Sequence, residues 1–155
     1  MHDFDVVFQY RGKSGKVYSW SNAGKGPGGS GGFYHDIFDV DDAKGRFYLC
    51  VATFIASGSL NSQSIEAVRI NGERIDLVEK LIRTPSGLQN SISFEYDFGS
   101  VLDRKERPIK LFHYDEQTKS FRFPVVVQDD ENPQGRVTDK FIRYRFNGKH
   151  FVKVS

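Results

Sequence analysis

Apolar and polar residues alternate along this chain, and that period of two constrains its fold more than any other feature. In residues 92–98 (ISFEYDF) every second side chain is aliphatic or aromatic. Residues 4–10 (FDVVFQY) follow the same pattern. A period of two places successive side chains on opposite faces of a β-strand, whereas a helix would repeat every 3.6 residues. The chain therefore has to fold as sheets with at least one buried face.

The rest of the sequence agrees with that pattern. Among 155 residues there are 14 Phe and 7 Tyr, which favour strands, and the hydrophobic content of 38% excludes disorder. Successive strand-like segments are separated by short turns. We therefore predict one all-β domain over residues 1–155. It is an antiparallel meander of about ten strands, arranged as a β-sandwich or a barrel, with little or no helix.

Individual segments allow more detailed predictions. Residues 46–56 are apolar on both faces, which is typical of a central strand that is covered on both sides. Asn71-Gly72 predicts a hairpin with a type I′ turn between strands at 63–70 and 74–83. Residues 74–83 also fit helical spacing, but the neighbouring hairpin favours a strand. Residues 128–136 are predicted to form a polar loop.

Six of the nine residues from Gly24 to Gly32 (GKGPGGSGG) are glycine. The segment lacks the Gly-Lys-Ser/Thr ending of a phosphate-binding loop, and a strand rather than a helix follows it. We predict a flexible surface connection, or a loop that contacts a partner. The candidate binding residues are the glycines and their neighbours: Gly28, Gly29, Gly31, Gly32, Trp20, Tyr34 and His35.

Glu95 and Asp97 are the candidate catalytic residues. They occupy positions i and i+2 of one strand, so their carboxyl groups share a face about 6 to 7 Å apart, near the separations that glycosidases use. Glu95-Tyr96-Asp97 resembles part of the Glu-x-Asp-x-x-Glu strand motif of certain β-jelly-roll glucanases, although Ser100 occupies the third acidic position. The resemblance implies a carbohydrate-active domain. The alternative is a solvated strand face.

The sequence predicts no metal site and no cofactor. The four histidines lack local metal-ligand spacing. Residues 39–45 begin like a calcium loop but have Lys44 where glycine is required. Cys50 is the single cysteine, so the chain can form neither an internal disulfide nor a thiolate cluster.

Charge and hydropathy bear on partners and location. The 22 basic and 20 acidic residues give a net charge of +2, too balanced to indicate a nucleic-acid partner. The longest apolar block, residues 47–56, has about half the length of a membrane span. Residues 1–4 lead directly into a strand pattern without a signal peptide, so the protein is cytoplasmic or exported and lacking its leader. The abrupt start favours export to the periplasm or the extracellular space.

These observations favour a binding domain over an enzyme, because no nucleophile, metal set or phosphate motif is assembled in the sequence. The expected partner is a protein or another macromolecule that contacts the loops. Two alternatives stay open. One is a small lectin-like or hydrolytic domain that uses Glu95 and Asp97. The other is a barrel that encloses an apolar ligand, with Trp20 and phenylalanines as its lining.

Overall fold

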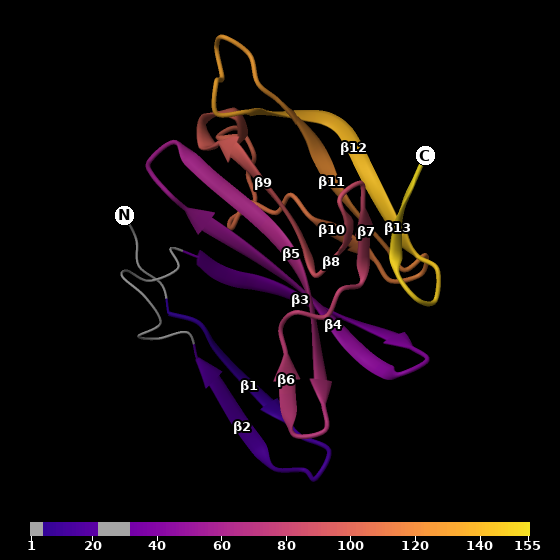
Figure 1. Cartoon of the computed structure of the whole chain (residues 1–155). Coiled ribbons are helices and arrows are strands. Elements are labelled where there is room, and N and C mark those ends of the chain that lie inside the picture. Colours follow the sequence, from indigo (N-terminus) through magenta and orange to yellow (C-terminus); the bar gives the residue numbers. More distant parts are fainter. Residues whose placement is uncertain (1–4, 22–31) are drawn as a thin grey trace.

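The computed structural model describes residues 5–21 and 32–155 as three β-sheets and one short 3₁₀ helix (Figure 1). The hairpin sheet contains β1 (Val7–Arg11) and β2 (Val17–Ser21). The five-stranded sheet contains β3 (Gly32–Asp42), β4 (Gly45–Ile55), β5 (Leu60–Asn71), β6 (Arg74–Asp76) and β9 (Ser91–Asp97). The six-stranded sheet has the order β10 (His113–Asp115), β11 (Ser120–Val127), β12 (Arg136–Phe146), β13 (Phe151–Val154), β7 (Ile82–Thr84), β8 (Gly87–Gln89). The 3₁₀ helix, η1 (Phe98–Val101), follows β9 directly.

The two larger sheets face each other as a sandwich rather than a closed barrel, and the predicted all-β fold class is confirmed. Phe47 and Ile65 from the five-stranded sheet and Phe121 and Phe151 from the six-stranded sheet belong to one buried cluster. Neighbouring strands run antiparallel within the described ranges, except β13 and β7, which pair in parallel. The alternating residues of both sheets meet at this interface, as the sequence pattern requires.

Aromatic rings fill the space between the two sheets. The Phe94 ring lies 5.3 Å from that of Phe112 and 5.7 Å from that of Phe123, measured between centroids. Phe121 stacks on Tyr144 at 5.4 Å with an interplanar angle of 7°. Each such ring buries about 150 to 250 Å² of surface. Within the described part of the chain, aromatic rings therefore occupy the interior between the two sheets.

The β1–β2 hairpin forms a third layer on the outer face of the five-stranded sheet (Figure 1). The Phe8 ring lies 5.1 Å from the Tyr34 ring, and the Tyr10 hydroxyl donates a hydrogen bond to the Glu73 carbonyl at 3.1 Å. Cys50, on the outer face of β4, is only 2% exposed. The central strand predicted at residues 46–56 is therefore β4, covered by the core on one side and the hairpin on the other.

Two local predictions need correction. The turn between β5 and β6 has Gly72 and Glu73 as its central residues, because Asn71 pairs with Arg74. Of these two, only Gly72 has a positive φ (63°), which is the pattern of a type II′ turn and not type I′. The single strand predicted at 74–83 is also wrong: β6 ends at Asp76, and the chain then crosses to the other sheet to begin β7.

The burial of the aromatic rings predicts how much stability is lost when one of them is replaced with alanine. Phe121 is 1% exposed, so Phe121→Ala should lower the free energy of unfolding by about 3 to 5 kcal/mol. Phe141 is 48% exposed, so the same change there should cost less than about 1 kcal/mol. Urea unfolding followed by circular dichroism measures both. Equal losses for the two variants would contradict the described packing.

Candidate functional site

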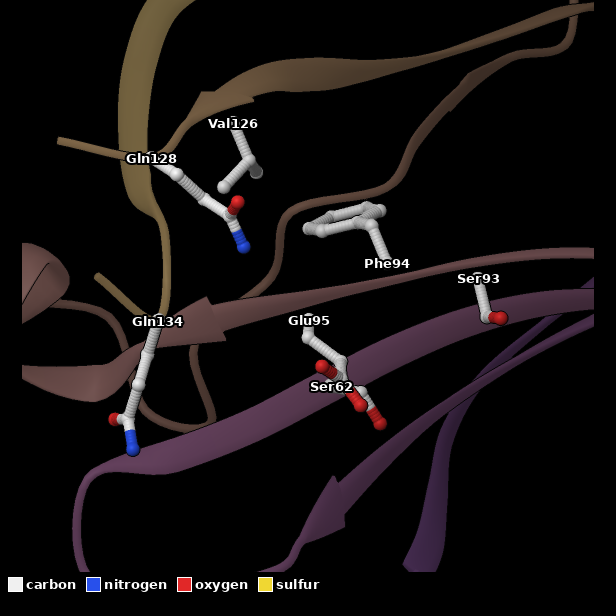
Figure 2. A pocket seen from close by; sticks show the side chains of 7 residues that line it. All are labelled: Ser62, Ser93, Phe94, Glu95, Val126, Gln128 and Gln134. Carbon is white, nitrogen blue, oxygen red and sulfur yellow. The ribbon is translucent and has the colours of Figure 1, made fainter. Parts of the chain in front are cut away.

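A groove of about 620 Å³ lies between β9 and the C-terminal end of β11 (Figure 2). Most of its side chains carry hydroxyl, amide or carboxylate groups. They are Ser62, Ser93, Phe94, Glu95, Val126, Gln128 and Gln134. Figure 2 shows Val126 and Gln128 on one side of the groove and Ser62, Ser93 and Glu95 on the other. A concave site of this size and composition is suited to a polar ligand.

The groove follows the open side of β9. It is lined by Phe94, which points into the core, and by Ser93 and Glu95, which point to the opposite face of the strand. A cavity that touches both faces of one strand has to run along that strand's edge. Two amides from the polar loop predicted at residues 128–136 also line the groove: Gln128 lies opposite Glu95, and Gln134 lies beside the end of β9 (Figure 2). The groove is therefore an edge site with one wall supplied by a loop.

Two polar groups in the groove are not used by the fold. Glu95 is exposed and makes no ion pair or side-chain hydrogen bond with any other described residue. The Oε1 atom of Gln134 is buried and has no hydrogen-bond partner within the described ranges. A buried polar atom without a partner costs free energy, so native structures normally satisfy it with protein, water or ligand. The groove thus offers an anionic group and an acceptor to a ligand.

Asp97, the other candidate catalytic residue, has a structural position. It is the N-cap of η1, and its Oδ1 atom accepts a hydrogen bond from the Gly99 backbone N–H at 2.8 Å. Aspartate at an N-cap satisfies a helix donor that would otherwise have no partner. Asp97 is not among the residues that line the groove, so the structure does not place the two carboxylates in one site.

The aromatic and histidine candidates also separate. Trp20 lies in β2, with its ring 5.8 Å from that of Phe8, and Phe8 in turn contacts Tyr34. The Tyr34 hydroxyl donates to Glu66 at 2.8 Å, and burial together with Glu66 raises the tyrosine's pKa. His35 points to the opposite face of the sheet. Trp20 and Tyr34 therefore belong to the contact between hairpin and sheet, and His35 lies apart from both.

His35 takes part in a hydrogen-bond chain that sequence reasoning missed. Its Nδ1 lies 2.9 Å from Asp36 Oδ2, and its Nε2 lies 2.9 Å from Thr53 Oγ1. Because a carboxylate only accepts, the ring donates from Nδ1 to Asp36. Asp36 also binds Lys110 Nζ at 3.1 Å.

This hydroxyl, imidazole and carboxylate follow one another in the order of a catalytic triad. However, Thr53 is only 6% exposed and does not line the groove. Its hydroxyl therefore cannot meet a substrate in this conformation. The chain of hydrogen bonds instead ties β3 and β4 to the segment that carries Lys110.

A β-bulge in β3 explains why the adjacent residues His35 and Asp36 can belong to the same hydrogen-bond chain. Tyr34 pairs with Ala52 and Asp36 pairs with Val51, so His35 is the extra residue in β3. A bulge turns the strand locally and changes the direction of its side chains. His35 and Asp36 consequently lie on the same face. A period-two reading of the sequence places them on opposite faces, and no local signal in the sequence marks the bulge.

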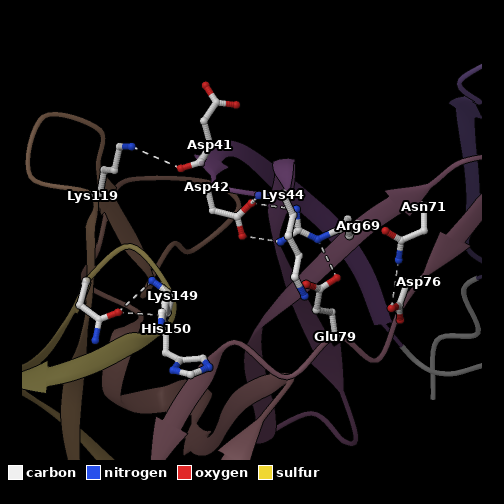
Figure 3. A network of polar contacts seen from close by, with 11 residues as sticks. Asp41, Asp42, Lys44, Arg69, Asn71, Asp76, Glu79, Lys119, Lys149 and His150 are labelled. Atoms are coloured by element: carbon white, nitrogen blue, oxygen red, sulfur yellow. Dashed lines mark hydrogen bonds and ion pairs between the residues drawn. The ribbon is translucent and has the colours of Figure 1, made fainter.

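Arg69 is the centre of a second polar network (Figure 3). Its side chain is only 3% exposed, and its guanidinium binds Asp42 through two hydrogen bonds of 3.1 and 2.6 Å. Its Nε donates to Glu79 at 2.7 Å. The hydrogen bonds from Arg69 lower the pKa of Asp42. The network joins β5 to the last residue of β3 and to the segment before β7, so its charges stabilise the fold.

The predicted glycines and Cys50 do not add to a binding or catalytic site in the described part of the chain. Gly28, Gly29 and Gly31 lie outside the described residues. Gly32 begins β3, and the Phe54 ring occupies the space that a Cβ would need there. Burial raises the pKa of the Cys50 thiol to about 12, so it is protonated at neutral pH.

No group of three or more His, Cys, Asp and Glu side chains in residues 5–21 and 32–155 is placed to hold a metal ion. In the same ranges no helix has the length and apolar character to cross a membrane. No family model matches the chain, and neither a curated protein nor a solved structure does.

The Arg69 network predicts how stability depends on pH. The hydrogen bonds from Arg69 lower the pKa of Asp42 in the folded state. The ionised carboxylate therefore stabilises the fold fully above the ordinary aspartate pKa of about 3.9, and this stabilisation is lost as the pH falls through the folded-state pKa. Asp42→Asn should lower the free energy of unfolding at pH 7 by about 1 to 3 kcal/mol. The variant should also lose less free energy of unfolding than the wild type as the pH falls from 4 to 2, because it lacks the Asp42 carboxylate whose protonation contributes to that loss.

Asp139→Asn is the matched control, because Asp139 is exposed and makes no contact of this kind with another described residue. Urea unfolding across that pH range measures both variants. If Asp139→Asn changed stability as much as Asp42→Asn, the described network would be wrong.

Proposed function

We propose that this protein is a non-enzymatic binding domain and that the groove beside β9 binds part of a macromolecule. One observation carries the proposal: Glu95 and the Oε1 atom of Gln134 line the same groove, and neither has a partner in the described part of the chain. The fold does not use their capacity for hydrogen bonds and charge. A ligand in the groove would use it.

The other polar groups support this choice by contrast. Asp97 caps η1, His35 bonds to Asp36 and Thr53, and Arg69 is paired with two carboxylates. Each of these groups already has a structural partner. The hydrolytic alternative needs a second carboxylate beside Glu95. Asp97 is oriented towards Gly99 instead, which favours binding over hydrolysis.

A carbohydrate is the second candidate ligand. Hydroxyl, amide and carboxylate side chains lie beside the Phe94 ring in the groove, and this combination suits the polar edges and apolar faces of a sugar. On this alternative the domain would be lectin-like, with Glu95 as a hydrogen-bond acceptor and not as an acid catalyst.

Filling the groove tests its role. Ser62→Trp places an indole into the groove, whereas Ser19→Trp places the same group on the exposed face of β2. The wild-type protein and both variants are screened on glycan and peptide arrays, and each hit is titrated in solution. Ser62→Trp should weaken binding at least about tenfold, because a tryptophan excludes the ligand, and Ser19→Trp should leave it unchanged.

Two results would contradict the proposal. One is a ligand whose affinity is the same for all three proteins, since it would bind elsewhere. The other is turnover of a glycan substrate that Glu95→Gln abolishes, since the groove would then be an active site.

A further inference from the structure

We infer that the open edge of β9 is a strand-addition site for an extended peptide that alternates apolar and basic side chains. The inference rests on the proposed function, because it names the macromolecule that occupies the groove. In this type of recognition the peptide adds a strand to a sheet. Backbone hydrogen bonds supply affinity, and alternate side chains supply specificity.

The pairing of β9 with β5 determines which backbone groups of β9 are available. Phe98 donates its N–H to the carbonyl of Ser59, and the Asn90 carbonyl accepts from Ala67. In an antiparallel pair the residues that bond to the partner alternate along the strand. The even-numbered residues of β9 therefore bond to β5, and the backbone groups of Ser93 and Glu95 point away from it.

Those outward groups have no hydrogen-bond partner in the described part of the chain. No hydrogen bond from another residue of the described ranges reaches the N–H or C=O of Ser93 or the N–H of Glu95. The edge ends immediately afterwards, because Asp97 donates its N–H to the Gly135 carbonyl at 2.7 Å. A Cβ at Gly135 would also lie 3.3 Å from the Glu95 carbonyl oxygen. The available edge is short and is centred on Ser93.

The side chains of the groove select the peptide. A strand added about 4.8 Å from β9 would direct alternate side chains to the two faces of the extended sheet. On the inner face they would meet Phe94 and Val126, which favours apolar residues. On the outer face they would meet Glu95, which has no cationic partner in the described part of the chain. Lysine or arginine fits there because of its charge.

The same charge disfavours a second copy of this chain. Two β9 edges paired about a two-fold axis at Ser93 would place each Glu95 opposite Ser91 of the other copy, which gives its carboxylate no cationic partner. A sugar has no backbone carbonyl groups at strand spacing, so it would not pair with the Ser93 N–H as an added strand would. The backbone and the charge therefore both favour a basic peptide.

The test uses two capped eight-residue peptides, one alternating valine with lysine and one alternating valine with glutamate. Titration by NMR should show the lysine peptide binding at least about tenfold more tightly, with the largest amide shifts at Ser93 and Glu95. Ser93→Pro should weaken binding about tenfold or more, because it removes an edge N–H without removing a bond to β5. Ser93→Ala keeps that N–H and should bind like the wild type.

A second measurement does not depend on the variants folding. The lysine peptide methylated on alternate backbone nitrogens should lose binding to the wild-type protein in one of the two methylation patterns and keep it in the other. Equal binding by both patterns would overturn the inference, and so would equal binding by Ser93→Pro and Ser93→Ala.

Other outcomes separate the inference from the proposed function. A glycan that binds in the groove while neither peptide binds would overturn the peptide but leave the binding site. Self-association that Ser93→Pro abolishes would make a second copy the occupant and would also overturn the inference. If no glycan or peptide binds at all, both the inference and the proposed function fail.

Discussion

The pairing of β9 with β5 is the interaction on which the rest of the structure depends. Its register directs Phe94 and Tyr96 into the sandwich, where the Phe94 ring contacts Phe112 and Phe123 and so connects the two sheets. The same register points the backbone groups of Ser93 and Glu95 away from the sheet. One set of hydrogen bonds thus builds the core and leaves the edge open beside it.

Polar groups in this fold divide into those that the structure uses and those that it does not. Arg69 is enclosed by two carboxylates, His35 bridges Asp36 and Thr53, and Asp97 caps η1. Burial of such groups is tolerated because each has its partners. Glu95 and the Oε1 atom of Gln134, in contrast, have no partner in the described part of the chain, and both line the groove beside β9. This contrast, and not the chemistry of any one residue, identifies the groove as the candidate site.

The sequence predicts much of the fold and little of the site. Alternation at residues 92–98 and the apolar stretch at 46–56 correctly indicate an all-β domain with a central covered strand. Period-two reasoning fails at His35, because the bulge in β3 depends on pairing with β4 and leaves no local mark. It also cannot show which strands form edges. Glu95 and the 128–136 loop were singled out from sequence, but their meeting in one groove depends on contacts distant along the chain.

Amide hydrogen exchange along β9 in the free protein tests the open edge most directly. Exchange is slow where an amide is hydrogen-bonded in a stable sheet and fast where it is open to water. We expect exchange to alternate along the strand: slow at Phe94 and Tyr96, which bond to β5, and fast at Ser93 and Glu95. Equal protection at all four amides would mean that another part of the protein covers this edge, and would contradict an open β9 edge.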